Sequence, residues 1–334
     1  MGLDTPAFRC WAGTAAPSIF GTDIVDHDWR AQGPHILQAL HGTTHAFHTF
    51  TLDRAHHESQ FGKVFYFTSC RHDAARNYAA PDGPDLQQRL ATRTERLEEE
   101  IWDSPEDFGM STEATSEDIA ISARAMAEKE VIGTESRILP VWLRLDRPFV
   151  IDASGKSDRA MFSDQEEDAF ERACRDVGEN HGISEEEIAG RMDEFEDEIN
   201  EVLDARWDDI YRTIEDALYD ISGRLDCEVP EMPEFDTPLP EIGCNDFETA
   251  FRRHEKNCYL ENEDGDLVSN TVFSALLERL GFDSIVLLNA DHRFATMDMK
   301  QGTSHIHLFA DRAAMIKSQM NCGRYDPDDP DIRA

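Results

Sequence analysis

The chain has 334 residues, of which 40% are hydrophobic and 9% aromatic, and this composition favours a packed core over wholesale disorder. It contains no run of 18 apolar residues, and its first residues lack a basic patch followed by an apolar stretch. We therefore expect neither a membrane span nor a secretory signal. The 69 acidic and 32 basic residues give a net charge of −37, which repels nucleic-acid phosphates over most of the surface.

The first 80 residues hold one segment with clear strand character. Residues 1–35 are expected to be irregular, with a candidate helix start near Asp26. The next segment is predicted to be a strand, or a short extended piece, that ends at Gly42. Residues 62–69 are rich in β-branched and aromatic side chains, which predicts a strand, and residues 72–79 have helical spacing.

Two helices and another strand come next. Periodic apolar residues predict helices at 85–101 and 116–131, the second with Ser116 as its N-cap. Between Pro140 and Pro148, apolar residues alternate with polar ones, as in a half-buried strand.

Residues 155–242 form an acidic block with 29 Asp and Glu against 8 Lys and Arg, a net charge of −21. Ser184 and Glu187 fit a capping box. From 188 to 225 an apolar stripe predicts one long amphipathic helix, or two joined end to end, whose stripe is a core face or a partner face. Four prolines within 228–243 close the block as a linker.

The remaining residues alternate helices and strands. Helices are predicted at 246–260, at 270–280 with a stop at Gly281, and at 311–320. Buried strands are predicted after Asp283 and at 305–309, before a turn-rich tail.

The overall acidity and the cysteines leave several interpretations open. The acidity serves solubility or a salt-adapted host, forms a partner-binding or DNA-mimicking surface, or docks a basic target protein. Seven scattered cysteines without a Cys-x-x-Cys pair predict neither a zinc site nor a disulfide framework, and a reducing cytoplasm is expected.

Several motifs occur in a distinctive order. His41, Gly42 and Thr43 follow the first predicted strand, and Phe47 and Phe50 come shortly after. An aromatic strand with Tyr66 and Phe67 is next, and then an alanine-rich helix that ends near Tyr78. Each feature alone is common in protein cores, so the combination and its spacing carry the information.

This arrangement resembles the NAD-binding half of ADP-ribosyltransferases of the His-Tyr-Glu class, which includes diphtheria-type toxins and poly(ADP-ribose) polymerases. It is most similar to the domains found in phage and mobile-element polyvalent proteins. The segments 138–152, 276–287 and 305–333 look like later strands, a helix–Gly–strand unit and the closing tail of that group. The resemblance spans 36–80, 137–152 and 266–333, and 85–136 and 153–245 have no counterparts.

The resemblance implies an α+β fold, an ADP-ribosyltransferase-like split β-sheet core with a large acidic α-helical insertion. Residues 1–152 would form the N-terminal half of the core, with the NAD-binding motifs in 36–80 and a helical segment at 85–136. Residues 153–245 would be the insertion, and 246–334 the C-terminal half with an Asp/Pro-rich tail. It also implies a phage or mobile-element toxin or effector, acting in the cytoplasm of a bacterial host or delivered into a target cell.

The resemblance also assigns roles in binding NAD as a co-substrate. Cleavage of the nicotinamide–ribose bond builds an oxocarbenium ion, which needs positioning and charge stabilisation. His41 would bond the adenine-side ribose 2′-hydroxyl, and Gly42 would offer its backbone to the carboxamide. Tyr66 and Tyr78 would cover the two faces of the nicotinamide. The implied binding residues also include Thr43 and Phe67. A serine that the family often has in the helix is replaced here by Ala74 or Ala75.

The third catalytic position departs from the family pattern. Anchored on Phe309, it falls at His305, and no Asp or Glu lies between Met299 and Phe309. A neutral histidine accepts one hydrogen bond but supplies no negative charge, and the lost carboxylate would cost about 3 to 4 kcal/mol. Candidate substitutes are Asp291 or Asp298 from the preceding loop, or Gln301. We therefore predict His41, Tyr66 and His305 as catalytic residues and single transfer rather than chain extension.

The predicted function is an NAD-dependent mono-ADP-ribosyltransferase, a glycosyltransferase whose acceptor is a macromolecule, protein rather than nucleic acid. The alternatives are a catalytically silent NAD-binding module, an NAD glycohydrolase, or an acidic decoy that uses the fold as a scaffold and binds a basic partner through the insertion. The cluster at 56–58 and the pair His305 and His307 offer candidate metal ligands, but a metal needs three or four ligands with a fixed geometry, and no metal is predicted.

Overall fold

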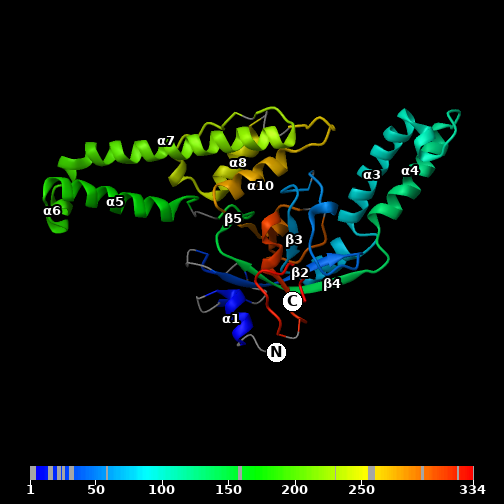
Figure 1. The fold of residues 1–334 in the computed structure, drawn as a ribbon, viewed down its shortest axis with the longest axis horizontal. Coiled ribbons are helices and arrows are strands. Elements are labelled where there is room, and N and C mark those ends of the chain that lie inside the picture. Colours follow the sequence, from blue (N-terminus) through cyan, green and yellow to red (C-terminus); the bar gives the residue numbers. More distant parts are fainter. Residues whose placement is uncertain are drawn as a thin grey trace. The chain divides into compact units, whose positions relative to one another are not determined.

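The computed structural model describes residues 5–13, 18–20, 24, 27–29, 34–57, 59–156, 160–229, 231–254, 260–294, 297–321 and 323–333. The chain forms two compact units, each assembled from separate stretches of sequence (Figure 1). Unit 1 comprises Met1–Thr51, Phe65–Asp146 and Val286–Ala334, and unit 2 comprises Leu52–Val64 and Arg147–Ile285.

Unit 1 is built on a mostly antiparallel sheet centred on β2 (His35–Thr43). On one side, β2 pairs with β4 (Arg137–Leu145), which pairs in turn with β8 (Ile316–Ser318). On the other side, β2 pairs with β3 (Phe65–Thr68), and β3 pairs with β7 (His305–Leu308). The expected α+β class and the strands at 62–69 and 305–309 are confirmed.

The expectation that residues 1–35 are irregular is wrong. Helix α1 (Pro6–Ala12) buries Phe8 and Trp11 against Tyr325, and β1 (Ser18–Phe20) pairs in parallel with β2. Asp26, the candidate helix start, lies outside the described residues. A three-residue strand is too short to show an alternating pattern, which is why the sequence did not reveal β1.

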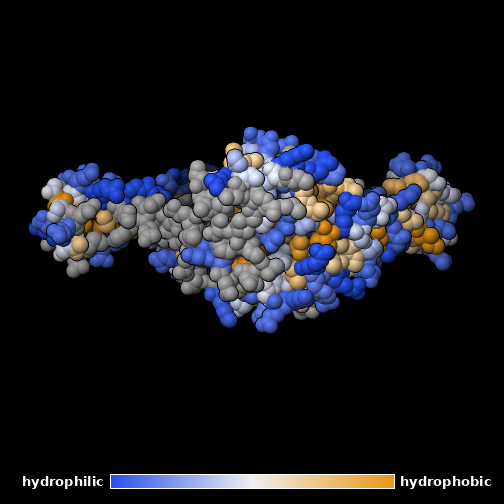
Figure 2. Space-filling model, turned by 90° about the horizontal axis from the view of Figure 1, so that it is seen from below, coloured by the Kyte–Doolittle hydropathy of each residue, from blue (hydrophilic) through white to orange (hydrophobic). Residues whose placement is uncertain are grey.

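Helices of unit 1 follow β3. The short α2 (Arg71–Asp73) continues into the π-helix η3 (Ala74–Ala79), which packs on β2. Next, α3 (Pro84–Asp103) and α4 (Ser116–Val131) form a hairpin with its own apolar core (Figure 1). The two are joined through the short η4 (Pro105–Phe108). Figure 2 shows hydrophobic residues on the surface of this hairpin, where Trp102 and Ile121 are exposed.

Two sequence-based boundaries in this part of the chain need correction. The N-cap of α4 is Thr115 rather than Ser116, and it forms a complete capping box with Asp118. Strand β4 runs through Pro140 instead of starting after it. Proline occurs there at the end of the pairing with the edge strand β8, and its carbonyl still accepts a hydrogen bond from the backbone N–H of Gln319 at 3.0 Å.

The acidic block belongs to unit 2 and is mainly helical, with α5 (Ser163–His181), α6 (Glu185–Gly190) and α7 (Met192–Leu225). The apolar stripe of α7 is a core face: Ile199 packs with Val177 of α5, and the C-terminal half contacts α10 (Ser269–Arg279). From 192 to 225 the predicted stripe lies on one long helix, α7, and only Ile188 lies before the break at Arg191, on α6. Ser184 is the N-cap of α6, but its side chain makes no capping bond, so the predicted capping box is wrong.

The rest of unit 2 surrounds an aromatic core. It contains β5 (Pro148–Asp152), α8 (Cys244–Arg253) and the first residues of β6 (Ser284–Leu288). Helix α8 ends earlier than the predicted residue 260, and residues 255–259 lie outside the described part. Gly281, at φ 85°, ends α10 as predicted. In the part of the chain that the structure describes, no helix is long and apolar enough to cross a membrane.

Candidate functional site

A cavity of about 30 Å³ in unit 1 brings together residues from four distant segments. Across the sheet, Leu40, Thr68 and His305 lie in one row, because Leu40 pairs with Thr68 and Thr68 with His305. The lining includes six of the seven residues that the motifs singled out, namely His41, Gly42, Tyr66, Phe67, Tyr78 and His305.

His41 is held by β3 and by aromatic rings. Its Nδ1 lies 2.8 Å from the carbonyl oxygen of Tyr66, and since a carbonyl only accepts, Nδ1 carries the proton and Nε2 the lone pair. Burial lowers the pKa of His41 to about 4, against a smaller opposing effect of the Tyr66 carbonyl, and the positive charge of Arg89 adds to the decrease. His41 is therefore a neutral hydrogen-bond acceptor at neutral pH.

Gly42 lies where the π-helix η3 meets β2. A Cβ atom at this position would overlap the carbonyl oxygen of Ala74 and come within 2.8 Å of Cβ of Tyr78. Close packing of helix on strand thus requires glycine here, whether or not a ligand approaches its backbone.

Two tyrosines line the cavity from different elements. Tyr66 on β3 presents its ring edge-to-face to His307, with ring centroids 4.8 Å apart. Tyr78 comes from η3, and π-helical turns are frequent at functional sites. Burial raises the pKa of Tyr78 well above its ordinary value, with further contributions from the negative charges of Asp73 and Asp85, so the side chain is a neutral phenol.

Thr43 is the motif residue that does not line the cavity. Its hydroxyl accepts a hydrogen bond from the backbone N–H of His45 at 3.1 Å and so stabilises the turn after β2. Of the two alanines at the position of the family serine, Ala74 is buried and Ala75 is exposed.

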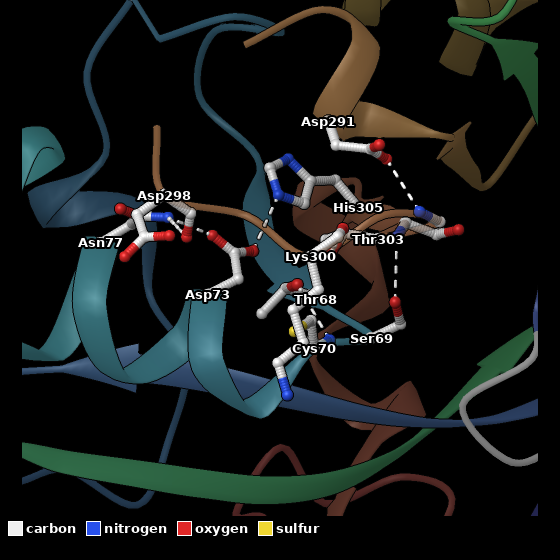
Figure 3. A network of polar contacts seen from close by, with 12 residues as sticks. Thr68, Ser69, Cys70, Asp73, Asn77, Asp291, Asp298, Lys300, Thr303 and His305 are labelled. Atoms are coloured by element: carbon white, nitrogen blue, oxygen red, sulfur yellow. Dashed lines mark hydrogen bonds and ion pairs between the residues drawn. The ribbon is translucent and has the colours of Figure 1, made fainter. Parts of the chain in front are cut away.

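His305 forms a buried pair with an aspartate that sequence reasoning missed (Figure 3). Its Nε2 lies 3.0 Å from Oδ2 of Asp73, and the side chains are 3% and 0% exposed. Oδ1 of Asp73 accepts from Nδ2 of Asn77 at 2.6 Å. Asn77 in turn donates to the carbonyl of Asp298 at 3.2 Å, which ties α2 and η3 to the loop before β7.

The charge of Asp73 is stabilised by these partners. Burial raises the pKa of Asp73, but the hydrogen bonds from His305, Thr68 and Asn77 favour the ionised carboxylate, and the pKa is lowered overall. The available sequence signal was an Asp in the first turn of the helix after the aromatic strand, with an Asn four residues later. That signal does not reveal a partner 232 residues away.

None of the three candidate substitutes for the missing acid reaches the cavity lining. Asp291 accepts a hydrogen bond from the backbone N–H of Gly302 at 3.0 Å and closes the loop before β7. The largely exposed carboxylate of Asp298 pairs with His72 at 3.0 Å. Gln301 is exposed in the turn.

The other sequence candidates have structural partners. In unit 2, Nδ1 of His57 lies 2.9 Å from the hydroxyl of Thr271, and Glu58 lies outside the described residues. Among the residues that the structure describes, no three His, Cys, Asp or Glu side chains are grouped as metal ligands. The cysteines described are free thiols.

Comparison with known proteins found no matching family model, no similar curated protein and no similar solved structure.

Proposed function

We propose that this chain has an ADP-ribosyltransferase-type fold and is an NAD-dependent mono-ADP-ribosyltransferase, which cleaves the nicotinamide–ribose bond and transfers ADP-ribose to a macromolecule. The observation that carries the proposal is the shared cavity: motif residues that lie up to 264 positions apart, from His41 to His305, line one small space. These residues come from β2, β3, η3 and β7, and the pairing of β2 with β3 and of β3 with β7 brings the strand residues together.

The chemistry of the lining supports binding of NAD. Nε2 of His41 is available as an acceptor for a ribose hydroxyl, because Nδ1 already donates to Tyr66. The aromatic rings of Tyr66 and Tyr78 suit an aromatic cation such as nicotinamide in NAD⁺. With a volume of about 30 Å³, the cavity holds roughly one water molecule, so this proposal requires the lining side chains to move apart when NAD binds.

The acceptor in this proposal is a protein rather than a nucleic acid. The net charge of −37 repels the phosphate backbone of a nucleic acid. An anionic polymer would therefore approach the cavity against electrostatic repulsion.

The test is to incubate the chain with NAD⁺ labelled on its adenylate and with candidate acceptor proteins, while measuring nicotinamide release and label transfer. We expect His41→Ala and Tyr66→Ala to reduce nicotinamide release about 100-fold or more. The matched variants His292→Ala and Tyr219→Ala, at exposed side chains, should retain the wild-type rate. Absence of NAD binding and of nicotinamide release in the wild type contradicts the proposal.

A second candidate is an NAD-binding module without turnover, and one observation favours it: among the residues that the structure describes, no carboxylate lines the cavity. Calorimetry separates the two functions. Binding of NAD⁺ that depends on His41, together with no release of nicotinamide, supports the silent module over the transferase.

A further inference from the structure

Asp73 and His305 form a buried pair in which the imidazole lies at the cavity and the carboxylate lies behind it. His305 lines the cavity, whereas Asp73 does not. Two lining residues bond Asp73, the His305 imidazole and the Thr68 hydroxyl, and of these two only the imidazole carries a basic nitrogen. Figure 3 shows the two side chains approaching from different elements, Asp73 from α2 and His305 from β7.

The surroundings fix the orientation of the imidazole. The ring of Phe294 stacks on His305 with centroids 5.5 Å apart, and Asn77 holds the opposite oxygen of Asp73. Because an ionised carboxylate only accepts, Nε2 of His305 carries a proton directed at Asp73. In the neutral ring the lone pair then lies on Nδ1, which does not face Asp73.

His41 and Tyr78 in the cavity lining, and His307 beside Tyr66, are poorly suited to accept a proton. His41 has a pKa of about 4, and its Nδ1 proton is committed to Tyr66. Tyr78 is a phenol whose pKa is raised well above its ordinary value by burial. His307, edge-on to Tyr66, has a pKa lowered well below its ordinary value, mainly by burial. Only His305 combines a place in the lining with a buried counter-charge, among the residues that the structure describes.

We propose that Asp73 is a positioning residue that holds His305 with Nε2–H toward the carboxylate, so that Nδ1 serves as the base that deprotonates an O–H nucleophile. This inference rests on the proposed NAD chemistry and narrows its acceptor to water or an alcohol hydroxyl. It differs from a direct replacement of the family acid, since the carboxylate acts through the imidazole and does not touch the ribose.

The step balances without a further reactant. The nucleophile oxygen bonds to C1′ of the nicotinamide ribose as the bond from C1′ to the nicotinamide nitrogen breaks, and its electron pair leaves with neutral nicotinamide. The proton of the nucleophile moves to Nδ1 of His305, and the resulting imidazolium is stabilised by the Asp73 carboxylate. The proton then passes to solvent, which restores the neutral ring.

The decisive variant is Asp73→Asn, which retains a hydrogen-bond acceptor for His305 but removes the charge. We expect kcat for nicotinamide release to fall about 100-fold or more, while the affinity for NAD⁺ measured by calorimetry and the KM stay near their wild-type values. The ascending limb of the pH–rate profile, which reports the base, should move to lower pH. Asp82→Asn, at an exposed carboxylate paired with Arg76, should leave all four quantities unchanged.

Asn77→Ala is a second variant, which tests the inference even if Asp73→Asn does not fold. It removes the bond to Oδ1 of Asp73 but keeps the Asp73 charge, and we expect a decrease in kcat of about 10-fold with NAD⁺ affinity retained. Equal rates and pH profiles in the wild type, Asp73→Asn and Asn77→Ala would mean that the pair is only a structural ion pair, and would overturn the inference while the proposed function stands.

An NMR measurement separates the tautomer from turnover. In protein labelled with nitrogen-15 at histidine, the His305 signals are identified by their loss in His305→Gln. We expect the neutral form protonated at Nε2, and a ring protonated at Nδ1 instead contradicts the inference. A wild-type protein that releases no nicotinamide overturns the proposed function, and with it the role of His305 as a base, whatever the tautomer.

The acceptor is tested in two arms. Free ADP-ribose as the product identifies water as the nucleophile. Label on a protein that withstands neutral hydroxylamine and maps to serine or threonine identifies a hydroxyl. Label that hydroxylamine removes marks a carboxylate acceptor, which has no proton for His305 to take at neutral pH, and this result contradicts the inference.

Discussion

Acidic side chains occupy two opposite environments in this chain. Along α5–α7 they lie mostly toward solvent, and ion pairs such as Arg212 with Asp209 are largely exposed, so each contributes little to stability. Beside β7, the single carboxylate of Asp73 is fully buried and depends on His305 and Asn77. The environment of an acid, rather than the number of acids, decides whether it shapes chemistry, because a buried carboxylate must recruit donors and thereby sets their protonation.

Glycines also occupy two environments, one closely packed and one open, and a comparison of the two gives the largest expected effect. Gly42→Ala places a Cβ against the Ala74 carbonyl and Tyr78, backbone and packed atoms that cannot rotate away. We expect a loss of about 3 kcal/mol in the opening free energy of β2, measured by amide hydrogen exchange. In α7, Gly223→Ala meets no atom within 4 Å and should stabilise the helix by roughly 0.5–1 kcal/mol.

Equal effects of the two substitutions would show that η3 does not pack on β2 as described. The result would also weaken the candidate site, because the close approach of η3 is what brings Tyr78 to His41. Exchange of α3–α4 amides, whose core is separate, serves as the internal reference.

Sequence reasoning predicted features that depend on residues close together in the chain, and missed those that depend on residues far apart in the chain. Local periodicity was sufficient for α3, α4 and the stripe of α7, because the helical repeat is visible within a few turns. It also predicted the strand of Tyr66 and the strand of His305. The pairing of β3 with β7 could not be read locally, since the two strands are separated by more than 230 residues.

The candidate site shows the same limit, because local sequence patterns do not reveal contacts between distant segments. Motif order led to His41, Gly42, Tyr66, Phe67, Tyr78 and His305, which share the cavity. It did not lead to Asp73, because an Asp at a helix start is typical of an exposed first-turn residue that favours the helix dipole. Only the register that sets Thr68 beside His305 buries this Asp under the imidazole.

The pH dependence of stability gives the second largest expected effect. The unfolded chain protonates His41 below about pH 6.5, whereas the folded chain does so only near its pKa of about 4. The folded state therefore binds fewer protons in this window, and its stability falls as the pH is lowered from 6.5 toward 4. From His41 alone we expect a loss of about 2 kcal/mol in unit 1 between pH 7 and pH 5.

His307, whose pKa is also lowered by burial, acts in the same direction. The measurement is amide exchange in β2 and β3 at several pH values, corrected for intrinsic exchange rates. His41→Gln should flatten the slope by about the stated amount, and an unchanged slope would mean that His41 is accessible to protons in the folded state.

The smallest expected effect concerns two helix starts that look alike in the sequence. Thr115 at the start of α4 accepts from the backbone N–H of Asp118, and the Asp118 carboxylate accepts from the backbone N–H of Thr115 at 3.0 Å. Thr115→Ala removes this capping box, and we expect a loss of about 1 kcal/mol in the opening free energy of the first turn of α4. Ser184 has the matching position in α6 but makes no side-chain capping bond, so Ser184→Ala should change the opening free energy of α6 by only a few tenths of a kcal/mol.

If Ser184→Ala costs as much as Thr115→Ala, the capping box expected from Ser184 and Glu187 forms in solution. The acidic helices would then be held by local caps as well as by the apolar stripe of α7. A near-zero effect leaves that stripe, and not the polar residues that dominate the segment, as the source of its order.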